Sequence, residues 1–282
     1  MTKGLVTSRK APAMYLDLMK KTLSFSLWPE PPVPVDMFEY KRFRPVSSFL
    51  AVVSRLLELG QLQLVKQRAV GRQQREEGSV LPGYADTMIG LKRLDNLQYC
   101  IETALEEGVP GDLIETGVWR GGACIFMRAV LAAYAISDRK VYLADSFDGL
   151  PKPDPASFPV DKGDRHYRKR YLAISQDEVA NNFRKYELLD DQVVFLKGWF
   201  KDTLPTAPID RLAVLRLDGD MYGSTMDALN HLYPKLSSGG FCIIDDYGLR
   251  RCKQAVDDYR REHGIQAELK TIDWSGRYWR KS

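Results

Sequence analysis

The second half of the chain alternates short apolar runs with segments of helical spacing, and this alternation limits the fold more than any other feature. The apolar runs predict strands at residues 112–115, 140–144, 193–197, 212–217 and 241–244. Helices are predicted between them, at residues 122–136, 177–186, 225–236 and 251–262. Such alternation is typical of a parallel sheet covered on both faces by helices. We therefore predict an α/β fold with a doubly wound, mostly parallel sheet, to which residues 267–279 add one or two strands.

The first 107 residues follow a different pattern. Apolar residues at helical intervals predict helices over residues 14–27, 46–70 and 87–107. Several prolines between residues 28 and 34 predict an extended linker, because proline lacks a backbone donor and restricts the residue before it. The polar segment 72–78 is expected to be a mobile loop. We accordingly divide the chain into an N-terminal helical part, residues 1–107, and an α/β domain, residues 108–282.

Composition argues against several classes of protein. No apolar run approaches the roughly 18 residues of a membrane-spanning helix, and charged residues interrupt the N-terminus where a signal peptide would be apolar. The four cysteines contain no Cys-x-x-Cys pair, so we expect reduced thiols. The net charge of +4 is small, and nucleic acid is not the expected partner. We read the basic segment 165–170 as a solvated surface first and as an anion contact second. These features predict a cytoplasmic protein with no membrane partner.

Glycine and acidic residues follow the first two predicted strands, at the edge where doubly wound sheets bind ligands. The first strand leads through Glu115 and Gly117 into a helix, and glycine there permits close backbone approach to a ligand. The second strand leads to Asp145, a residue type that can accept hydrogen bonds from both hydroxyls of a ribose. This combination indicates a nucleotide cofactor, with a turn or helix cap as the competing interpretation of Asp145.

The turn after the third predicted strand contains Gly198 and Trp199. The glycine again permits close approach, and we weigh an adenine contact and core packing equally for Trp199. A dinucleotide-dependent oxidoreductase would carry Gly-x-Gly-x-x-Gly after the first strand, and this chain lacks that pattern. A hydrolase of the Ser-His-Asp type would carry Gly-x-Ser-x-Gly, which is also absent.

Four carboxylates follow the fourth and fifth predicted strands: Asp218, Asp220, Asp245 and Asp246. If these strands are parallel neighbours, their ends meet, and the crowded carboxylates raise one another's pKa values. A hard divalent cation relieves this repulsion, since Mg²⁺, Mn²⁺ and Ca²⁺ prefer oxygen ligands. The alternative is that these aspartates are turn residues and helix caps. This alternative would be favoured for one strand end with two aspartates, but not for two such ends that face each other. We therefore predict a metal site without histidine ligands, and keep His166 as an outside candidate for substrate contact.

Several motifs together resemble the macrocin-type sugar O-methyltransferases, the tylosin-pathway family. They lie at residues 115–122, 145–147, 198–200, 217–222 and 245–247. Residues 15–18, 20–23, 87–90 and 93–96 are also similar, so the likeness covers nearly the whole chain. The resemblance implies a class I, Rossmann-like methyltransferase that uses S-adenosylmethionine and Mg²⁺, with Mn²⁺ as a substitute. It implies a deoxysugar hydroxyl of a glycosylated natural product as the acceptor.

The resemblance also assigns roles to residues. Asp218, Asp245 and Asp246 match the metal ligands, while Asp220 matches the proposed general base and joins Asp218 as the expected catalytic pair. The expected cofactor site consists of Glu115, Thr116, Gly117, Val118, Gly121, Asp145, Ser146, Phe147, Gly198, Trp199 and Met88. By the same resemblance, residues 1–107 contribute a helical lid, residues 108–282 form the catalytic domain, and the chain forms homo-oligomers.

Other functions stay open on the sequence alone. A catechol or another phenol is the chief rival acceptor, because metal-assisted methylation of phenols uses a similar carboxylate arrangement. A metal-dependent phosphoesterase would have no need of the residues at 115–117 and 145. An NAD-dependent oxidoreductase and a non-catalytic binding protein complete the alternatives. The sequence does not define the sugar, the hydroxyl or the aglycone.

Overall fold

The computed structural model describes residues 4–35 and 45–282. Its centre is a seven-stranded sheet in the order β5-β4-β3-β6-β7-β9-β8. The parallel strands are β3 (Asp112–Thr116), β4 (Val141–Asp145), β5 (Val193–Lys197), β6 (Leu212–Leu217) and β7 (Leu236–Ile244). Antiparallel β9 (Arg277–Arg280) and β8 (Lys270–Thr271) complete the sheet. The predicted doubly wound, mostly parallel sheet is thereby confirmed, and its strand order reverses between β3 and β6, where such sheets bind ligands.

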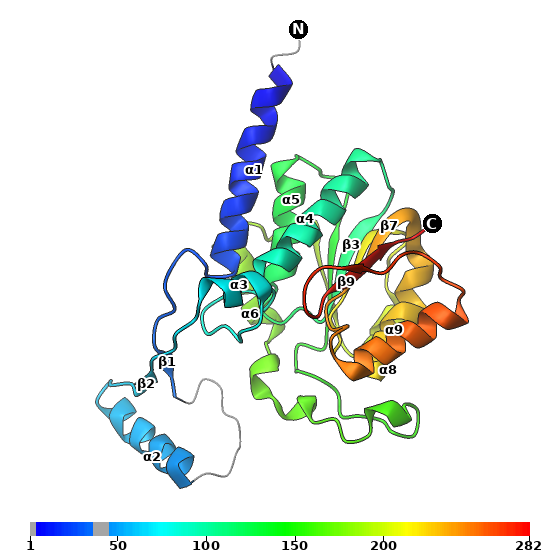
Figure 1. Cartoon of the computed structure of the whole chain (residues 1–282). Helices are drawn as coiled ribbons and strands as arrows, with labels where there is room; N and C mark the ends of the chain where they lie inside the picture. Colours follow the sequence, from blue (N-terminus) through cyan, green and yellow to red (C-terminus); the bar gives the residue numbers. More distant parts are fainter. Residues whose placement is uncertain (1–3, 36–44) are drawn as a thin grey trace.

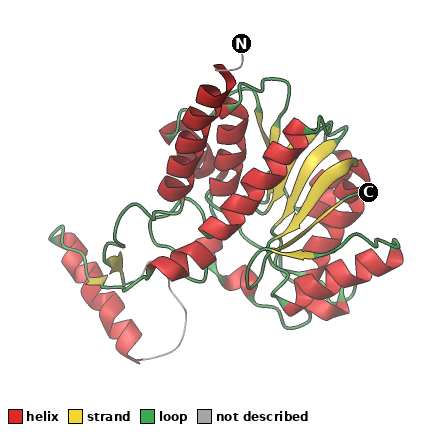
Figure 2. Ribbon diagram, turned by 45° about the horizontal axis from the view of Figure 1, so that its top comes forward, coloured by secondary structure: helices red, strands yellow, loops and turns green. Residues whose placement is uncertain are grey.

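Helices cover both faces of the sheet (Figure 2). One layer contains α1 (Gly4–Leu23), α4 (Leu91–Glu106), α5 (Gly122–Ala133) and α6 (Gln176–Lys185). The other contains α7 (Phe200–Thr203), α8 (Tyr222–Leu232) and α9 (Arg250–Glu262). Within the described ranges, none of the helices is long and apolar enough to cross a membrane.

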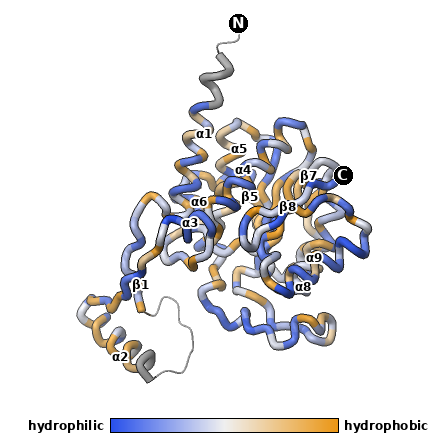
Figure 3. Tube along the Cα trace, in the orientation of Figure 1, coloured by the Kyte–Doolittle hydropathy of each residue, from blue (hydrophilic) through white to orange (hydrophobic). Residues whose placement is uncertain are grey.

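Successive residues of the central strands pack into opposite layers. In β3, Leu113 lies in the core beneath α4 and α5, whereas Ile114 lies in the core beneath α8 and α9. Val214 and Leu215 divide in the same way in β6. Both faces are apolar, which explains why the strands read as continuous apolar runs in the sequence (Figure 3).

The N-terminal helices differ in how they contact the sheet. Leu16 and Leu23 of α1 have no exposed surface, and they share one core cluster with Leu94 of α4 and Phe126 of α5. In contrast, α2 (Pro45–Leu59) projects from the body beside the short antiparallel pair β1 (Val33–Pro34) and β2 (Val65–Lys66) (Figure 1). Two of these helices thus belong to the core of the sheet, while α2 stands apart from it.

The segment 72–78 is a helix, α3 (Arg72–Glu77), so the expectation of a mobile loop was wrong. Arg72 pairs with Glu76 one turn later, at 2.8 Å. The buried Arg75 binds the Glu30 carboxylate and the carbonyl oxygen of Ser24, which ties the helix to the end of α1 and the linker. The polar composition of this segment indicated a loop. The contacts that stabilise the helix come from residues distant in sequence, so the local pattern did not reveal them.

Other helix and strand ends differ from the predicted ones. The first helix ends at Leu23, the second ends at Leu59, and the third begins at Leu91. The chain turns after the second helix at Gly60 and Gln61, and Gln61 has a φ of +58°. In the α/β domain every predicted strand and helix is present, but β7 begins at Leu236, which the apolar spacing had joined to the preceding helix. Termini are the least certain feature of a periodic pattern, because the pattern does not specify caps.

Candidate active site

A cavity of about 860 Å³ opens beyond the carboxyl ends of the parallel strands. All four predicted carboxylates line it, and so do eight of the predicted cofactor residues: Met88, Glu115, Gly117, Val118, Asp145, Ser146, Gly198 and Trp199. Three predicted residues lie outside this lining. Thr116 is fully buried in β3, and Gly121 is the N-cap residue of α5. Phe147 lines an adjoining hollow of about 350 Å³, which Trp199 also lines. The cofactor motifs and the carboxylates therefore meet in one cavity.

Asp218, Asp245 and Asp246 form a cluster in which each residue offers a ligand oxygen within 4.8 Å of the others. They come together because β6 and β7 are parallel neighbours, with Leu217 opposite Ile244. Loss of solvent and the neighbouring Asp245 raise the pKa of Asp218 to about 8. Loss of solvent and the nearby aspartates also raise the pKa of Asp246 well above its usual value. The ionised carboxylates repel one another, so the cluster fits a divalent cation with oxygen ligands.

Asp220 adopts a backbone conformation that is uncommon for a residue with a side chain. Its φ is +56°, in the left-handed region. Its backbone N–H donates to the Asp246 carboxylate at 3.0 Å, which stabilises this turn. Loss of solvent raises the pKa of Asp220, although His166 and Lys169 lower it in part. A carboxyl group with a raised pKa, held beside a cluster of this kind by a left-handed backbone, is suited to accept a proton.

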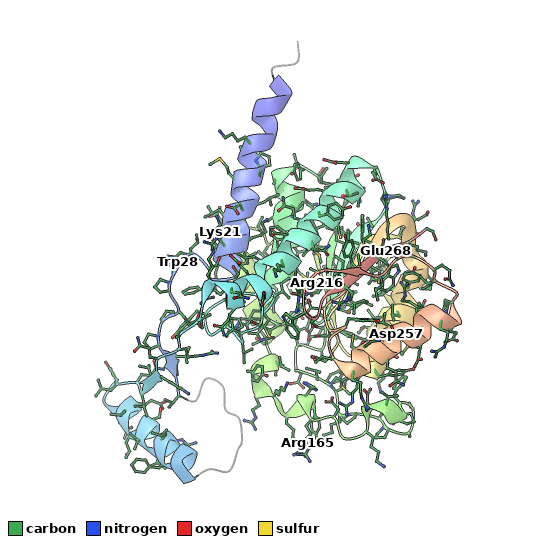
Figure 4. All side chains as sticks on the ribbon, viewed as in Figure 1. Lys21, Trp28, Arg165, Arg216, Asp257 and Glu268 are labelled. Atoms are coloured by element: carbon green, nitrogen blue, oxygen red, sulfur yellow. The ribbon has the colours of Figure 1, made fainter. Side chains whose placement is uncertain are left out.

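Arg216, which was not predicted from the sequence, forms ion pairs with several carboxylates of the site. It lies in β6, is 1% exposed, and binds the carboxylates of Glu115, Asp218 and Asp245. Figure 4 shows Arg216 in the interior of the body, whereas Arg165 lies at its outer edge. A buried guanidinium requires such compensation. The available signal was one charged residue within an otherwise apolar strand.

Glu115 is 2% exposed, and both of its carboxylate oxygens have partners. One oxygen pairs with Arg216, and the other accepts the Cys124 thiol at 2.9 Å. Burial raises the pKa of Glu115, and the Arg216 charge opposes this shift. The Glu115 side chain therefore pairs with Arg216 within the sheet, while its contact with a cofactor stays a prediction.

The Asp145 carboxylate connects the turns that follow β3 and β4. It accepts the backbone N–H groups of Val118 at 2.8 Å and Phe147 at 2.7 Å. This is the turn-capping role that the sequence left open. Asp145 also lines the cavity, so a ribose contact remains compatible with its position and stays a prediction.

The loop between β4 and α6 forms a wall of the cavity and is anchored by two acidic residues that sequence reasoning missed. Asp161, 1% exposed, accepts the backbone N–H groups of Tyr222 and Gly223 at 2.9 and 2.8 Å, at the start of α8. Asp164 contacts the His166 ring nitrogen Nδ1 at 2.9 Å. His166 is thus held within this loop and does not line the cavity, unlike its neighbours Tyr167 and Lys169. Only the chain fold reveals these anchors, because Asp161 lies 61 positions from Tyr222.

Comparison with known proteins agrees with this geometry. Residues 12–281 match the macrocin-O-methyltransferase (TylF) family. The chain is 55% identical over 222 residues, 78% of this chain and 87% of the relative, to mycinamicin III 3''-O-methyltransferase of Micromonospora griseorubida. It is 48% identical over 268 residues, 95% of this chain and 92% of the relative, to 8-demethyl-8-(2,3-dimethoxy-alpha-L-rhamnosyl)-tetracenomycin-C 4'-O-methyltransferase of Streptomyces olivaceus.

The solved structure of the O-methyltransferase NovP is similar over 96% of this chain and 99% of that chain, with a TM-score of 0.79 and 44% identity. Sequence, fold and cavity therefore lead to one assignment, which confirms the resemblance carried by the motifs. The chain belongs to the macrocin O-methyltransferase family and is an S-adenosylmethionine-dependent O-methyltransferase.

Proposed function

We propose that the enzyme transfers the methyl group of S-adenosylmethionine to a deoxysugar hydroxyl of a glycosylated natural product, assisted by a divalent metal on Asp218, Asp245 and Asp246. The approach of three carboxylate oxygens to within 4.8 Å carries the metal part of the proposal. The named activities of the relatives, on mycinamicin III and on a rhamnosyl tetracenomycin, support a glycosylated acceptor in antibiotic biosynthesis. Mg²⁺ is the proposed ion, with Mn²⁺ as a substitute.

The cofactor is proposed to bind across the turns after β3, β4 and β5. Gly117 and Val118 would offer backbone groups, Asp145 would accept the ribose hydroxyls, and Trp199 would contact the adenine. Ser146, Gly198 and Met88 line the same cavity and would complete the contacts. Thr116, Gly121 and Phe147 lie outside the lining and would support these turns from behind.

The chemical problem is the poor nucleophilicity of a neutral sugar hydroxyl. A bound divalent cation would lower the pKa of that hydroxyl. Asp220 is proposed to accept the hydroxyl proton, because its carboxyl group lines the cavity and its backbone contact with Asp246 fixes its direction. The walls of the cavity would align the acceptor oxygen with the methyl group and sulfur. Alignment of this kind contributes on the order of several kcal/mol to a barrier reduction.

The acceptor class is tested with labelled S-adenosylmethionine, Mg²⁺ and a panel of deoxysugar glycosides and catechols, followed by NMR location of the methyl group. Mycinamicin III and rhamnosylated tetracenomycins are suitable first glycosides, given the relatives. We expect the label on a sugar oxygen. Transfer to catechols with none to any glycoside would select the phenol alternative instead.

We also propose that the enzyme self-associates through α2. Phe49, Val52, Leu56 and Leu59 form one stripe along this helix, with exposed fractions of 67%, 57%, 63% and 85%. The helix stands away from the body in Figure 1, and much of it is coloured hydrophobic in Figure 3. Exposed apolar surface of this kind marks interaction sites. Light scattering should show that the unmodified enzyme is an oligomer and that Leu56→Glu has a smaller mass. A monomer mass for the unmodified enzyme would contradict the proposal.

The division into an N-terminal lid, residues 1–107, and a catalytic domain, residues 108–282, also remains a proposal. Because α1 and α4 belong to the core of the sheet, the moving part of the lid is proposed to be the arm of β1, α2 and β2. A cytoplasmic location is proposed as well, and the four buried free cysteines suit a reducing compartment.

A further inference from the structure

The C-terminal turn between β8 and β9 packs on the end of the strand that leads to Asp245. The Ser275 hydroxyl donates to the Asp245 carbonyl oxygen at 2.8 Å and accepts the backbone N–H of Gly248 at 3.2 Å. Ser275 is 2% exposed. A Cβ on Gly248 would lie 3.0 Å from the Ser275 hydroxyl oxygen, so the two segments are in close contact. The turn thus supports the backbone of a predicted metal ligand.

Arg93, in α4, connects the same turn with the Asp245 carboxylate. Its Nη1 donates to Asp245 Oδ2 at 2.6 Å, and its Nε donates to Asp273 Oδ2 at 2.7 Å. The other oxygen of Asp273 accepts the backbone N–H groups of Ser275 and Gly276, at 2.9 and 2.6 Å. Burial alone would raise the pKa of Asp273, but Arg93 and these amides outweigh burial and lower the pKa below its usual value. The carboxylate is therefore ionised at neutral pH. A fixed carboxylate therefore orients Arg93.

The Asp245 carboxylate is held on both sides. Oδ1 pairs with Arg216 from within the sheet, and Oδ2 pairs with Arg93 from α4. Each carboxylate oxygen has two lone pairs, so an oxygen that accepts an arginine N–H can still face a cation. Arg216 has Glu115 and Asp218 as further counter-charges. Arg93 pairs in addition with Asp273.

We propose that Asp273 and Arg93 are positioning residues of the metal site: Asp273 orients Arg93 and balances its charge, and Arg93 fixes the Asp245 carboxylate toward the cation. The inference rests on the proposed metal binding. Without Asp273, the Arg93 charge would fall on Asp245 alone and compete with the cation for its oxygens. Carboxylates that orient metal ligands in other proteins contribute about 10- to 100-fold to metal affinity.

The test is a titration of the full-length enzyme with Mn²⁺ by calorimetry. Asp273→Asn keeps the shape of the side chain and removes its charge, and we expect Mn²⁺ affinity to fall about tenfold. The same substitution in an Arg93→Met background should produce no further loss, because Asp273 acts through Arg93. An unchanged affinity in Asp273→Asn, or an equal loss in both backgrounds, would overturn the inference.

Asp190→Asn provides the matched control. Asp190 accepts Arg128 Nε at 3.0 Å, and Arg128 is 8% exposed, but neither residue lines the cavity. This variant should bind Mn²⁺ as the unmodified enzyme does. Thermal unfolding identifies any variant that fails to fold, and Arg93→Lys then replaces Asp273→Asn, since one ammonium group cannot reproduce both guanidinium contacts. Arg93→Lys should also bind Mn²⁺ about tenfold more weakly, and unchanged affinity there overturns the inference.

The titration distinguishes a failure of the proposed metal binding from a failure of the role given to Asp273. An unmodified enzyme that binds no Mn²⁺ contradicts the proposed metal function itself. An unmodified enzyme that binds Mn²⁺, together with an Asp273→Asn enzyme of the same affinity, contradicts the role of Asp273 and leaves the metal function standing.

Discussion

The carbonyl oxygen of Asp218 occupies the space where a side chain on Gly117 would begin: a Cβ there would lie 1.8 Å from that oxygen. Gly117 follows β3 and Asp218 follows β6, and these strands are parallel neighbours. The backbone N–H of Asp218 donates to the Thr116 carbonyl oxygen at 2.9 Å. The contact places the proposed cofactor turn directly beside a proposed metal ligand, at the point where the strand order reverses.

Gly117→Ala should therefore destabilise the enzyme and displace Asp218. Its φ of +86° is unfavourable for alanine, and the clash with the Asp218 carbonyl oxygen adds to this cost. We expect a loss of more than about 2 kcal/mol in the free energy of unfolding, measured with urea. Gly163→Ala is the control, since Gly163 has a φ of +81° and open space around its Cβ position. Equal losses in the two variants would contradict a close contact at Gly117.

Asp218→Ala should lower turnover severely and leave cofactor binding nearly intact. The side chain is a proposed metal ligand, and a catalytic metal contributes several kcal/mol, so the rate should fall about a hundredfold or more. Calorimetry with S-adenosylhomocysteine measures the cofactor site separately. Excess EDTA should lower the turnover rate of the unmodified enzyme to a similar extent. Full activity of the variant and of the EDTA-treated enzyme would exclude the metal hypothesis.

Asp220→Asn should lower turnover while Mn²⁺ still binds. General-base catalysis contributes about 10²- to 10⁴-fold, and an amide cannot accept the hydroxyl proton. Single-turnover rates and a parallel Mn²⁺ titration distinguish loss of the base from loss of the metal. If the rate is unchanged, Asp220 is a structural residue of the turn.

Metal binding should release a proton from Asp218. Loss of solvent first, and then Asp245, raise the pKa of Asp218 to about 8, so the metal-free folded enzyme keeps this proton at neutral pH. Mg²⁺ must displace it, so Mg²⁺ affinity should rise by about tenfold per pH unit between pH 6 and pH 8. Calorimetry between pH 6 and 9 measures this dependence. A flat profile would show that Asp218 is already ionised without metal.

The same raised pKa predicts how the stability of the metal-free enzyme changes with pH. An unfolded aspartate has a pKa of about 3.9, so between that value and about 8 the folded state binds the extra proton at Asp218. The contribution of Asp218 to stability is therefore favourable at pH 6 and is lost as the pH rises through 8. Thermal unfolding at pH 6 and pH 9 tests this, with Asp218→Asn as the variant in which the contribution disappears.

Local patterns in the sequence were sufficient to predict the sheet and the meeting of its polar ends. The residues after β6 and β7 were expected to converge if the strands were neighbours, and the register of Leu217 with Ile244 confirms this. Short continuous apolar runs indicate strands buried on both faces, and apolar residues at helical intervals indicate helices that bury one face. The expected crowding of carboxylates depended on these strands being neighbours, and the family resemblance singled out Asp218, Asp245 and Asp246 among them.

The ion pairs that organise the site could not be predicted in the same way. Arg93 and Asp273 are separated by 180 positions, and Arg216 and Glu115 by 101. No spacing rule links residues so far apart, so only the folded chain reveals that Asp273 and Glu115 have arginine partners. The helix at residues 72–77 was missed for the same reason, since Arg75 binds Glu30 across 45 positions.

The central claim is that Asp218, Asp245 and Asp246 hold a metal beside the transferred methyl group. Crystals grown with Mn²⁺ and S-adenosylhomocysteine test it most directly through the anomalous signal of manganese. We predict one strong peak within about 2.5 Å of an oxygen from each of the three carboxylates, with the cofactor sulfur facing the same cavity. Clear density for the cofactor with no manganese peak at these carboxylates, at saturating Mn²⁺, would contradict the account.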